Sequence, residues 1–146
     1  MIKPTISQIE EFLFAVDHLF PVRLSQKQNL HDFAMKLYHK ATICCVIVED
    51  KIVAMVGGYT ENLADNISYI SVVATLPAFQ GKGYAKGLLG EFIGICQEKE
   101  LSGIHLYTSR TNLAAKALYK SWGFQEWNCQ NEPRPDDLHL ICILKE

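Results

Sequence analysis

The chain has 146 residues, of which 49% are hydrophobic and 21% charged, and its formal net charge is −2. This length fits a single domain over residues 1–146, large enough to bury about two thirds of the surface of the unfolded chain. The near balance of charges argues against a nucleic-acid-binding protein, and the apolar runs are too short to cross a membrane.

The first third of the chain predicts two helices and a β-hairpin. Two capping-box patterns, each followed by apolar residues at helical spacing, place the helix starts at Ser7 and Ser25. Pro21 ends the first helix. Apolar and β-branched residues then favour strands over residues 42–48 and 52–59, joined by a tight turn.

A glycine-containing turn follows the third predicted strand, which spans residues 67–75. The turn reads Gln80-Gly81-Lys82-Gly83-Tyr84-Ala85. It leads directly into a predicted helix, in which apolar residues recur three or four positions apart up to Cys96. Such a turn presents unpaired backbone N–H groups at the positive end of the helix dipole, and glycine allows close approach of an anion. It is therefore a candidate phosphate-binding turn.

The last third of the chain predicts one more helix among three strands. A strand is expected over residues 103–109, and Asn112 is the predicted N-cap of a helix that stops at Gly123. Strands over residues 124–129 and 137–144 complete the set. The order of elements predicts an α/β fold in which a mixed sheet has helices on both faces.

The cysteines and the N-terminus bear on cellular location and metal content. Five cysteines, an odd number without C-x-x-C spacing, predict neither a disulfide framework nor a structural zinc site. The N-terminus lacks the apolar core and cleavage site of a secretory signal. We therefore expect a cytoplasmic protein without a bound metal.

Two common nucleotide-binding motifs do not match the glycine turn. A Walker loop requires G-x-x-x-x-G-K-[ST], which is absent. A Rossmann fingerprint that starts at Gly81 requires a small residue where Lys86 stands. Direct binding of ATP or NAD is therefore not expected.

The turn resembles the Q/R-x-x-G-x-G/A signature of the GNAT acetyltransferases, which holds the pyrophosphate of acetyl-CoA. The strand before it resembles the strand of that family that contacts pantetheine, and the segment from Asn112 to Phe124 resembles the second conserved segment. The resemblance covers residues 67–124, with the motifs in the expected order. It implies a GNAT fold with a mostly antiparallel central sheet.

The resemblance also implies a set of site residues. Those expected to contact acetyl-CoA are Val73, Ala74, Thr75, Gln80, Gly81, Lys82, Gly83, Tyr84, Ala85 and Asn112. Tyr119 is the expected general acid, which returns a proton to the departing CoA thiolate. A tyrosine stays protonated at neutral pH, because its ordinary pKa is near 10.

The general base and the acceptor remain open at this point. The family often uses a carboxylate near the pantetheine strand, but this strand offers none, so the candidates for the base are Glu61, Asp65, His105 and Glu126. The leading hypothesis is an acetyl-CoA-dependent N-acetyltransferase that acts by direct transfer on a primary amine of a small molecule or peptide. The alternative is a non-catalytic CoA-binding sensor or interaction module. Formation of a homodimer is common in the family.

Overall fold

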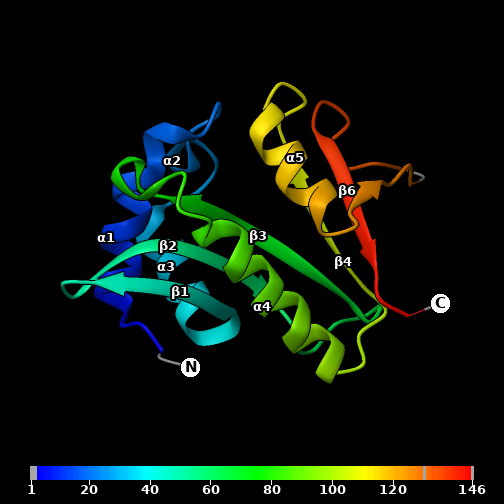
Figure 1. Ribbon diagram of the computed structural model, residues 1–146, viewed down its shortest axis with the longest axis horizontal. Helices are drawn as coiled ribbons and strands as arrows, with labels where there is room; N and C mark the ends of the chain where they lie inside the picture. Colours follow the sequence, from blue (N-terminus) through cyan, green and yellow to red (C-terminus); the bar gives the residue numbers. More distant parts are fainter. Residues whose placement is uncertain (1–2, 130, 146) are drawn as a thin grey trace.

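A computed structural model describes residues 3–129 and 131–145, and shows one sheet with helices on both faces (Figure 1). The strands are β1 (Thr42–Val48), β2 (Lys51–Tyr59), β3 (Ile67–Thr75), β4 (Gly103–Thr108), β5 (Gln125–Glu126) and β6 (Leu138–Ile143). They form a six-stranded sheet in the order β1-β2-β3-β4-β6-β5. All neighbours are antiparallel except β3 and β4, which are parallel. The predicted fold class is therefore confirmed.

Five α-helices and two 3-10 turns cover the sheet in the described part of the chain. They are α1 (Ile6–Val16), η1 (Asp17–Leu19), α2 (Leu24–Lys27), α3 (Leu30–Lys40), η2 (Pro77–Phe79), α4 (Tyr84–Glu98) and α5 (Leu113–Ser121). Helices α1 and α3 pack on one face, and α4 lies across the other. Helix α4 connects the parallel strands β3 and β4, as such a crossover requires.

Two helix caps differ from the prediction. The capping box of α1 is formed by Thr5 and Gln8, two residues before the predicted pair, so Ser7 lies inside the helix. The second predicted helix is divided in two: Ser25 lies inside the short α2, and α3 has its own cap, Asn29, whose side chain accepts from the Asp32 N–H at 3.0 Å. A capping residue needs an extended backbone next to the first helical turn, and several polar residues compete for that position in sequence.

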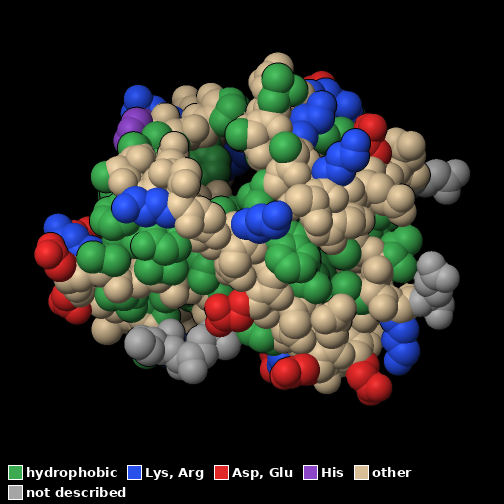
Figure 2. Space-filling view, in the orientation of Figure 1, with side chains coloured by type: hydrophobic (Ala, Val, Ile, Leu, Met, Phe, Trp, Pro, Cys, Tyr) green, Lys and Arg blue, Asp and Glu red, His purple; other side chains and the backbone are tan. Residues whose placement is uncertain are grey.

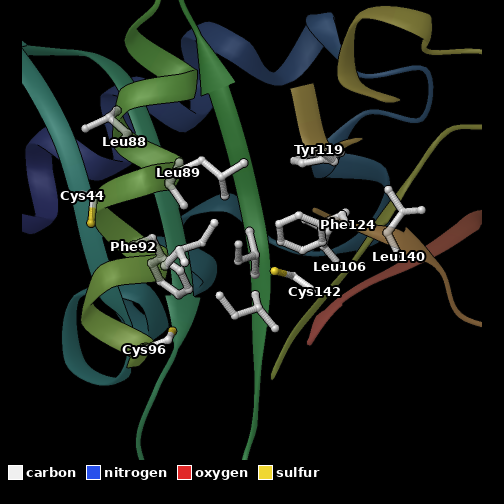
Figure 3. Packing of buried hydrophobic residues seen from close by; sticks show 14 of the residues in the cluster. Cys44, Leu88, Leu89, Phe92, Cys96, Leu106, Tyr119, Phe124, Leu140 and Cys142 are labelled. Carbon is white, nitrogen blue, oxygen red and sulfur yellow. The ribbon is translucent and has the colours of Figure 1, made fainter. Parts of the chain in front are cut away.

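The core consists of two apolar layers, one on each face of the sheet. Strand alternation sends the adjacent Cys44 and Cys45 into opposite layers. Figure 3 shows the layer beneath α4 and α5, where Phe92 packs among Leu89 and Cys96. This layer reaches across β3 to the β4 and β6 side of the sheet.

A β-bulge in β3 changes which side chains face each layer. The register with β2 runs from Val72 opposite Gly57 to Ile70 opposite Gly58, which leaves Ser71 without a partner. As a result Ile70 and Val72, although two positions apart, enter opposite layers. A Cβ at Gly58 would lie 2.7 Å from Phe92 Cζ and 2.8 Å from the Tyr69 carbonyl oxygen, so glycine is required there.

Beyond the bulge, β3 and β4 separate. The parallel pairing ends at Tyr69 opposite His105, although β3 continues to Thr75 and β4 to Thr108. Figure 1 shows the two strands diverging from their paired ends, β4 remaining with β6. The unpaired lengths form the two walls of an opening in the sheet.

The close packing at Gly58 generates the first prediction. We expect Gly58→Ala to lower the free energy of unfolding by about 1–3 kcal/mol, because the added methyl group overpacks against Phe92 and backbone. The control is Gly94→Ala in α4, where a Cβ meets nothing within 4 Å. There alanine should stabilise by about 0.5–1 kcal/mol. Urea unfolding measures both changes, and equal effects at the two positions would contradict the packing argument.

Candidate active site

Two adjoining cavities lie in the opening between β3 and β4. The turn groove, about 570 Å³, runs along the glycine turn and the end of β3. The strand cavity, about 220 Å³, lies between the diverging strands. They share the lining residues Phe20, Pro21, Val73, Asn112, Ala115 and Tyr119. Figure 2, in the orientation of Figure 1, shows a hollow in the upper part of the molecule, with Lys and Arg side chains around it.

The glycine turn presents a row of free amide groups. Gly81 and Gly83 have φ values of +80° and +81°, the left-handed region that favours glycine. The first main-chain hydrogen bond after the turn is from the Gly87 N–H to the Gly83 carbonyl. Within the described chain, the amide groups of residues 81–86 donate no hydrogen bond. Six successive N–H groups at the N-terminus of a 15-residue helix are therefore available to an anion.

The end of β3 offers main-chain groups to the opening as well. The Leu76 N–H donates to the Val53 carbonyl at 2.8 Å, and hydrogen-bonded pairs alternate along an antiparallel ladder. The main-chain groups of Ala74 are therefore used by β2, whereas those of Val73 and Thr75 point toward the opening. The Thr75 carbonyl already accepts from Gln80 Nε2 at 3.2 Å, which ties the turn to the strand.

Asn112 lies where the two cavities meet. Its Oδ1 accepts from the Ala115 N–H at 3.1 Å, so the predicted N-cap of α5 is confirmed. This bond uses the carbonyl end of the side chain and leaves the amide donors free in the described structure. A structural and a binding role are thus compatible in one side chain.

Tyr119 projects from α5 into the junction of the cavities. The residue is only 6% exposed, and its ring packs against Phe124 with centroids 5.7 Å apart (Figure 3). Its hydroxyl makes no hydrogen bond to any described residue, and burial raises the pKa of the phenol above its ordinary value. Tyr119 therefore holds its proton at neutral pH beside both cavities.

Trp122 fixes α5 against α4. Its indole Nε1 donates to the Lys86 carbonyl at 3.0 Å, and a Cβ at Gly90 would lie 2.6 Å from the ring. The predicted helix stop at Gly123 is confirmed, with φ +88°. These contacts hold the Tyr119 side chain at a set distance from the glycine turn.

The predicted site residues do not all lie on the cavities. The turn groove is lined by Val73, Ala74, Thr75, Gln80, Gly81, Gly83, Ala85, Asn112 and Tyr119. Lys82 and Tyr84 line neither cavity: the Lys82 ammonium lies 5.9 Å from the Phe79 ring centroid, and Tyr84 packs against the core. For these two residues, contact with a ligand in the groove stays a prediction.

None of the four candidate bases lines either cavity. Glu61 forms an ion pair with Lys99, and Asp65 accepts from the Ile67 N–H at 3.0 Å. His105 Nδ1 lies 2.8 Å from His139 Nε2, and Glu126 is exposed on β5. The Asp137 carboxylate is the acidic side chain of the strand cavity in the described structure.

Several lining residues were missed by the sequence reasoning. Those of the strand cavity with polar side chains are Lys27, Ser71, Tyr107, Thr108 and Ser109. The Ser71 hydroxyl, at the unpaired position of the bulge, is buried without a hydrogen-bond partner among the described residues. Arg134 lies over the Tyr107 ring at 4.9 Å. These residues come from distant segments, and no local pattern brings them together.

Comparison with known proteins agrees with this geometry. The model of the acetyltransferase (GNAT) family matches residues 8–124. The chain belongs to the GNAT acetyltransferase family. The crystal structure of the PaiA N-acetyltransferase from Thermoplasma acidophilum, in complex with coenzyme A, has the same GNAT fold. Its TM-score is 0.70 at 13% identity, over 97% of this chain and 96% of that one.

Two GNAT relatives match at the sequence level over shorter stretches. A mycothiol acetyltransferase from Renibacterium salmoninarum is 45% identical over 62 residues, 42% of this chain and 18% of that protein. A [ribosomal protein bS18]-alanine N-acetyltransferase from Haemophilus ducreyi is 35% identical over 92 residues, 53% of this chain and 62% of that protein. The chain thus spans less than two thirds of these relatives. No helix within its described residues has the length and apolar character needed to cross a bilayer.

The buried phenol of Tyr119 predicts an alkaline loss of stability. Because its pKa is raised, the folded protein keeps a proton that the unfolded chain releases above pH ~10, so unfolding becomes more favourable as pH rises. Between pH 8 and pH 11 the wild type should lose about 1.4 kcal/mol more than Tyr119→Phe. Urea unfolding at both pH values measures this difference, and identical losses would show that Tyr119 titrates normally.

Proposed function

We propose that this protein transfers an acetyl group from acetyl-CoA directly to a primary amine, within a ternary complex. The observation that carries the proposal is the row of free amides at residues 81–86, on a groove that leads to a buried, protonated tyrosine. The pyrophosphate of acetyl-CoA suits this row of amides as a hydrogen-bond acceptor. The thioester at the other end of the coenzyme can then extend along β3 to Tyr119.

The turn groove would hold the coenzyme. The amides of residues 81–86 donate to the pyrophosphate, each such contact contributing about 0.3–1 kcal/mol. Pantetheine then extends beside β3 as an added strand, bonded to the free main-chain groups of Val73 and to the free N–H of Thr75. The free amide donors of Asn112 face the same arm from α5. This path brings the thioester to the point where both cavities meet.

At that junction the chemistry needs an oxyanion donor and an acid. The Val73 N–H, directed into the opening, can polarise the thioester carbonyl as negative charge develops on its oxygen. The amine nitrogen attacks the carbonyl carbon, the C–S bond breaks, and Tyr119 donates its proton to the thiolate sulfur. The attacking nitrogen, neutral before the attack and cationic once bonded to the carbonyl carbon, releases one proton, and the phenolate of Tyr119 regains a proton from it or from solvent.

The strand cavity would receive the acceptor. Its volume of about 220 Å³ fits a small amine or the end of a peptide. Asp137 can pair with the ammonium, while Lys27 and Arg134 suit an acceptor that also carries a carboxylate or phosphate. The two GNAT relatives act on different acceptors by name, so the choice of acceptor rests on this cavity.

The proposal is tested by release of CoA thiol. The protein is incubated with acetyl-CoA and a panel of amines, amino acids, amino sugars and peptides, and free thiol is measured with and without each acceptor. We expect acceptor-dependent release for at least one class, strongest for amines that carry an anionic group. Coenzyme binding without release for any member would favour the non-catalytic sensor. Formation of a homodimer stays a prediction.

The glycine turn gives a prediction for coenzyme affinity. Gly81→Ala should weaken coenzyme A binding by about tenfold, because a side chain strains the left-handed backbone and disturbs the amide row. The matched control is Gly123→Ala, which has the same strain at φ +88° but lines neither cavity. Its stability should fall equally while its affinity stays unchanged. Isothermal titration decides, and equal affinities in both variants would remove the turn from the site.

The general acid gives a prediction for turnover. Tyr119→Phe removes only the hydroxyl, so we expect coenzyme affinity to be kept and kcat to fall about 10²-fold or more. Tyr38→Phe serves as the control, since Tyr38 on α3 packs against the core layer on the other face of the sheet and lines neither cavity. A Tyr119→Phe enzyme with unchanged kcat would show that another group protonates the thiolate.

A further inference from the structure

A cluster of potential metal ligands lies next to Tyr107, a residue that also lines the strand cavity. Cys129, Glu132 and His139 direct one potential ligand atom each to a common point, and these atoms all lie within 4.8 Å of one another. The Cys129 Sγ is 3.1 Å from Glu132 Oε2 and 3.6 Å from His139 Nδ1. Glu132 Oε2 and His139 Nδ1 are 2.7 Å apart.

We propose that Cys129, Glu132 and His139 form a Zn²⁺ site with three protein ligands and an open fourth position. The sequence lacks C-x-x-C spacing and so predicted no metal. This group instead joins a loop to a strand, with one thiol, one carboxylate and one imidazole. Sulfur, nitrogen and oxygen ligands together suit Zn²⁺, whereas Mg²⁺ and Ca²⁺ prefer oxygen alone.

The distances suit an ion of this size after small shifts. Zinc bonds of about 2.0–2.3 Å at tetrahedral angles place the ligand atoms about 3.3–3.6 Å apart. The Sγ to Nδ1 distance of 3.6 Å already matches, and the two contacts to Oε2, at 3.1 and 2.7 Å, must lengthen by about 0.5–0.6 Å. One thiolate and one carboxylate balance the charge of the ion, and the thiol proton of Cys129 is released to solvent on binding.

The neighbours of the cluster leave these three atoms free for a metal. Glu132 Oε1 accepts from the Tyr107 hydroxyl at 2.6 Å and from the Arg134 N–H at 3.1 Å, so Oε2 is the oxygen left for an ion. His139 Nε2 bonds to His105 Nδ1 at 2.8 Å, which leaves Nδ1 as the ligand atom. Outer hydrogen bonds of this kind orient metal ligands in proteins.

A metal ion at the cluster would hold the loop between β5 and β6 to the sheet, next to the strand cavity. The chain between β5 and β6 contains no helix or strand in its described part, and these side chains hold it to the sheet. Tyr107 and Arg134, which contact Glu132, also line the strand cavity. His139 is 7% exposed while Cys129 and Glu132 are partly open, so an ion can enter from solvent. A bound Zn²⁺ would fix one wall of that cavity.

The test uses Co²⁺ as a spectroscopic substitute for Zn²⁺ on chelator-treated, full-length protein. We expect one equivalent to give a thiolate-to-metal charge-transfer band and tetrahedral d–d bands, both bleached by Zn²⁺. Zn²⁺ should also raise the melting temperature of the protein. Absence of the charge-transfer band in the folded wild type at stoichiometric metal overturns the proposal.

Variants then assign the ligands. Cys129→Ser should abolish the charge-transfer band and His139→Ala should weaken binding at least tenfold, whereas Cys45→Ser, a half-buried cysteine of β1, should bind as the wild type does. Glu132→Gln keeps the shape of the side chain, so it tests the carboxylate if the other variants fold poorly. A band that persists in Cys129→Ser, or disappears in Cys45→Ser, contradicts the assignment.

Discussion

The divergence of β3 from β4 is the constraint on which the rest of the structure depends. Two parallel strands that stayed paired would leave no room for a ligand in the sheet. Here pairing stops after Tyr69, next to the bulge at Ser71, and Gly58 makes the bulge possible by leaving space for Phe92 and the backbone. As a consequence, the unpaired main chain of β3 and the side chain of Tyr119 line the same opening.

The opening is bordered by elements that are rigid for independent reasons. Helix α4 is anchored in the core by Phe92, and its first turn is left with unpaired amides because glycines precede it. Helix α5 is held to α4 through Trp122. Preorganised donors of this kind need no rearrangement when charge develops on a ligand, which is what transfer of an acyl group requires.

Local patterns in the sequence predicted the local parts of the site. The glycine turn, the strand before it, the cap at Asn112 and the stop at Gly123 each depend on a few neighbouring residues, and all were found. Helix caps were displaced because adjacent polar residues compete for them. The bulge at Ser71 was not predicted, since it depends on register with β2.

Much of the lining of the strand cavity was beyond sequence reasoning for a related reason. Lys27, Ser71 and Tyr107 belong to segments far apart in the chain, and only the separation of β3 and β4 brings them together. The cluster of Cys129, Glu132 and His139 was not predicted for the same reason. Cys129 and Glu132 lie in the loop before β6, and only the fold places His139 of β6 next to them. The strand cavity and the cluster both depend on how the folded chain brings distant residues together, which residue types alone do not predict.

Titration of ¹⁵N-labelled protein with coenzyme A tests the central claim most directly. The account predicts that the amide resonances of residues 81–86, together with those of Val73 and Thr75, move most as coenzyme is added, while Ala74 moves less because β2 uses its amide. Shifts concentrated elsewhere on the sheet, or none at millimolar coenzyme, would contradict it.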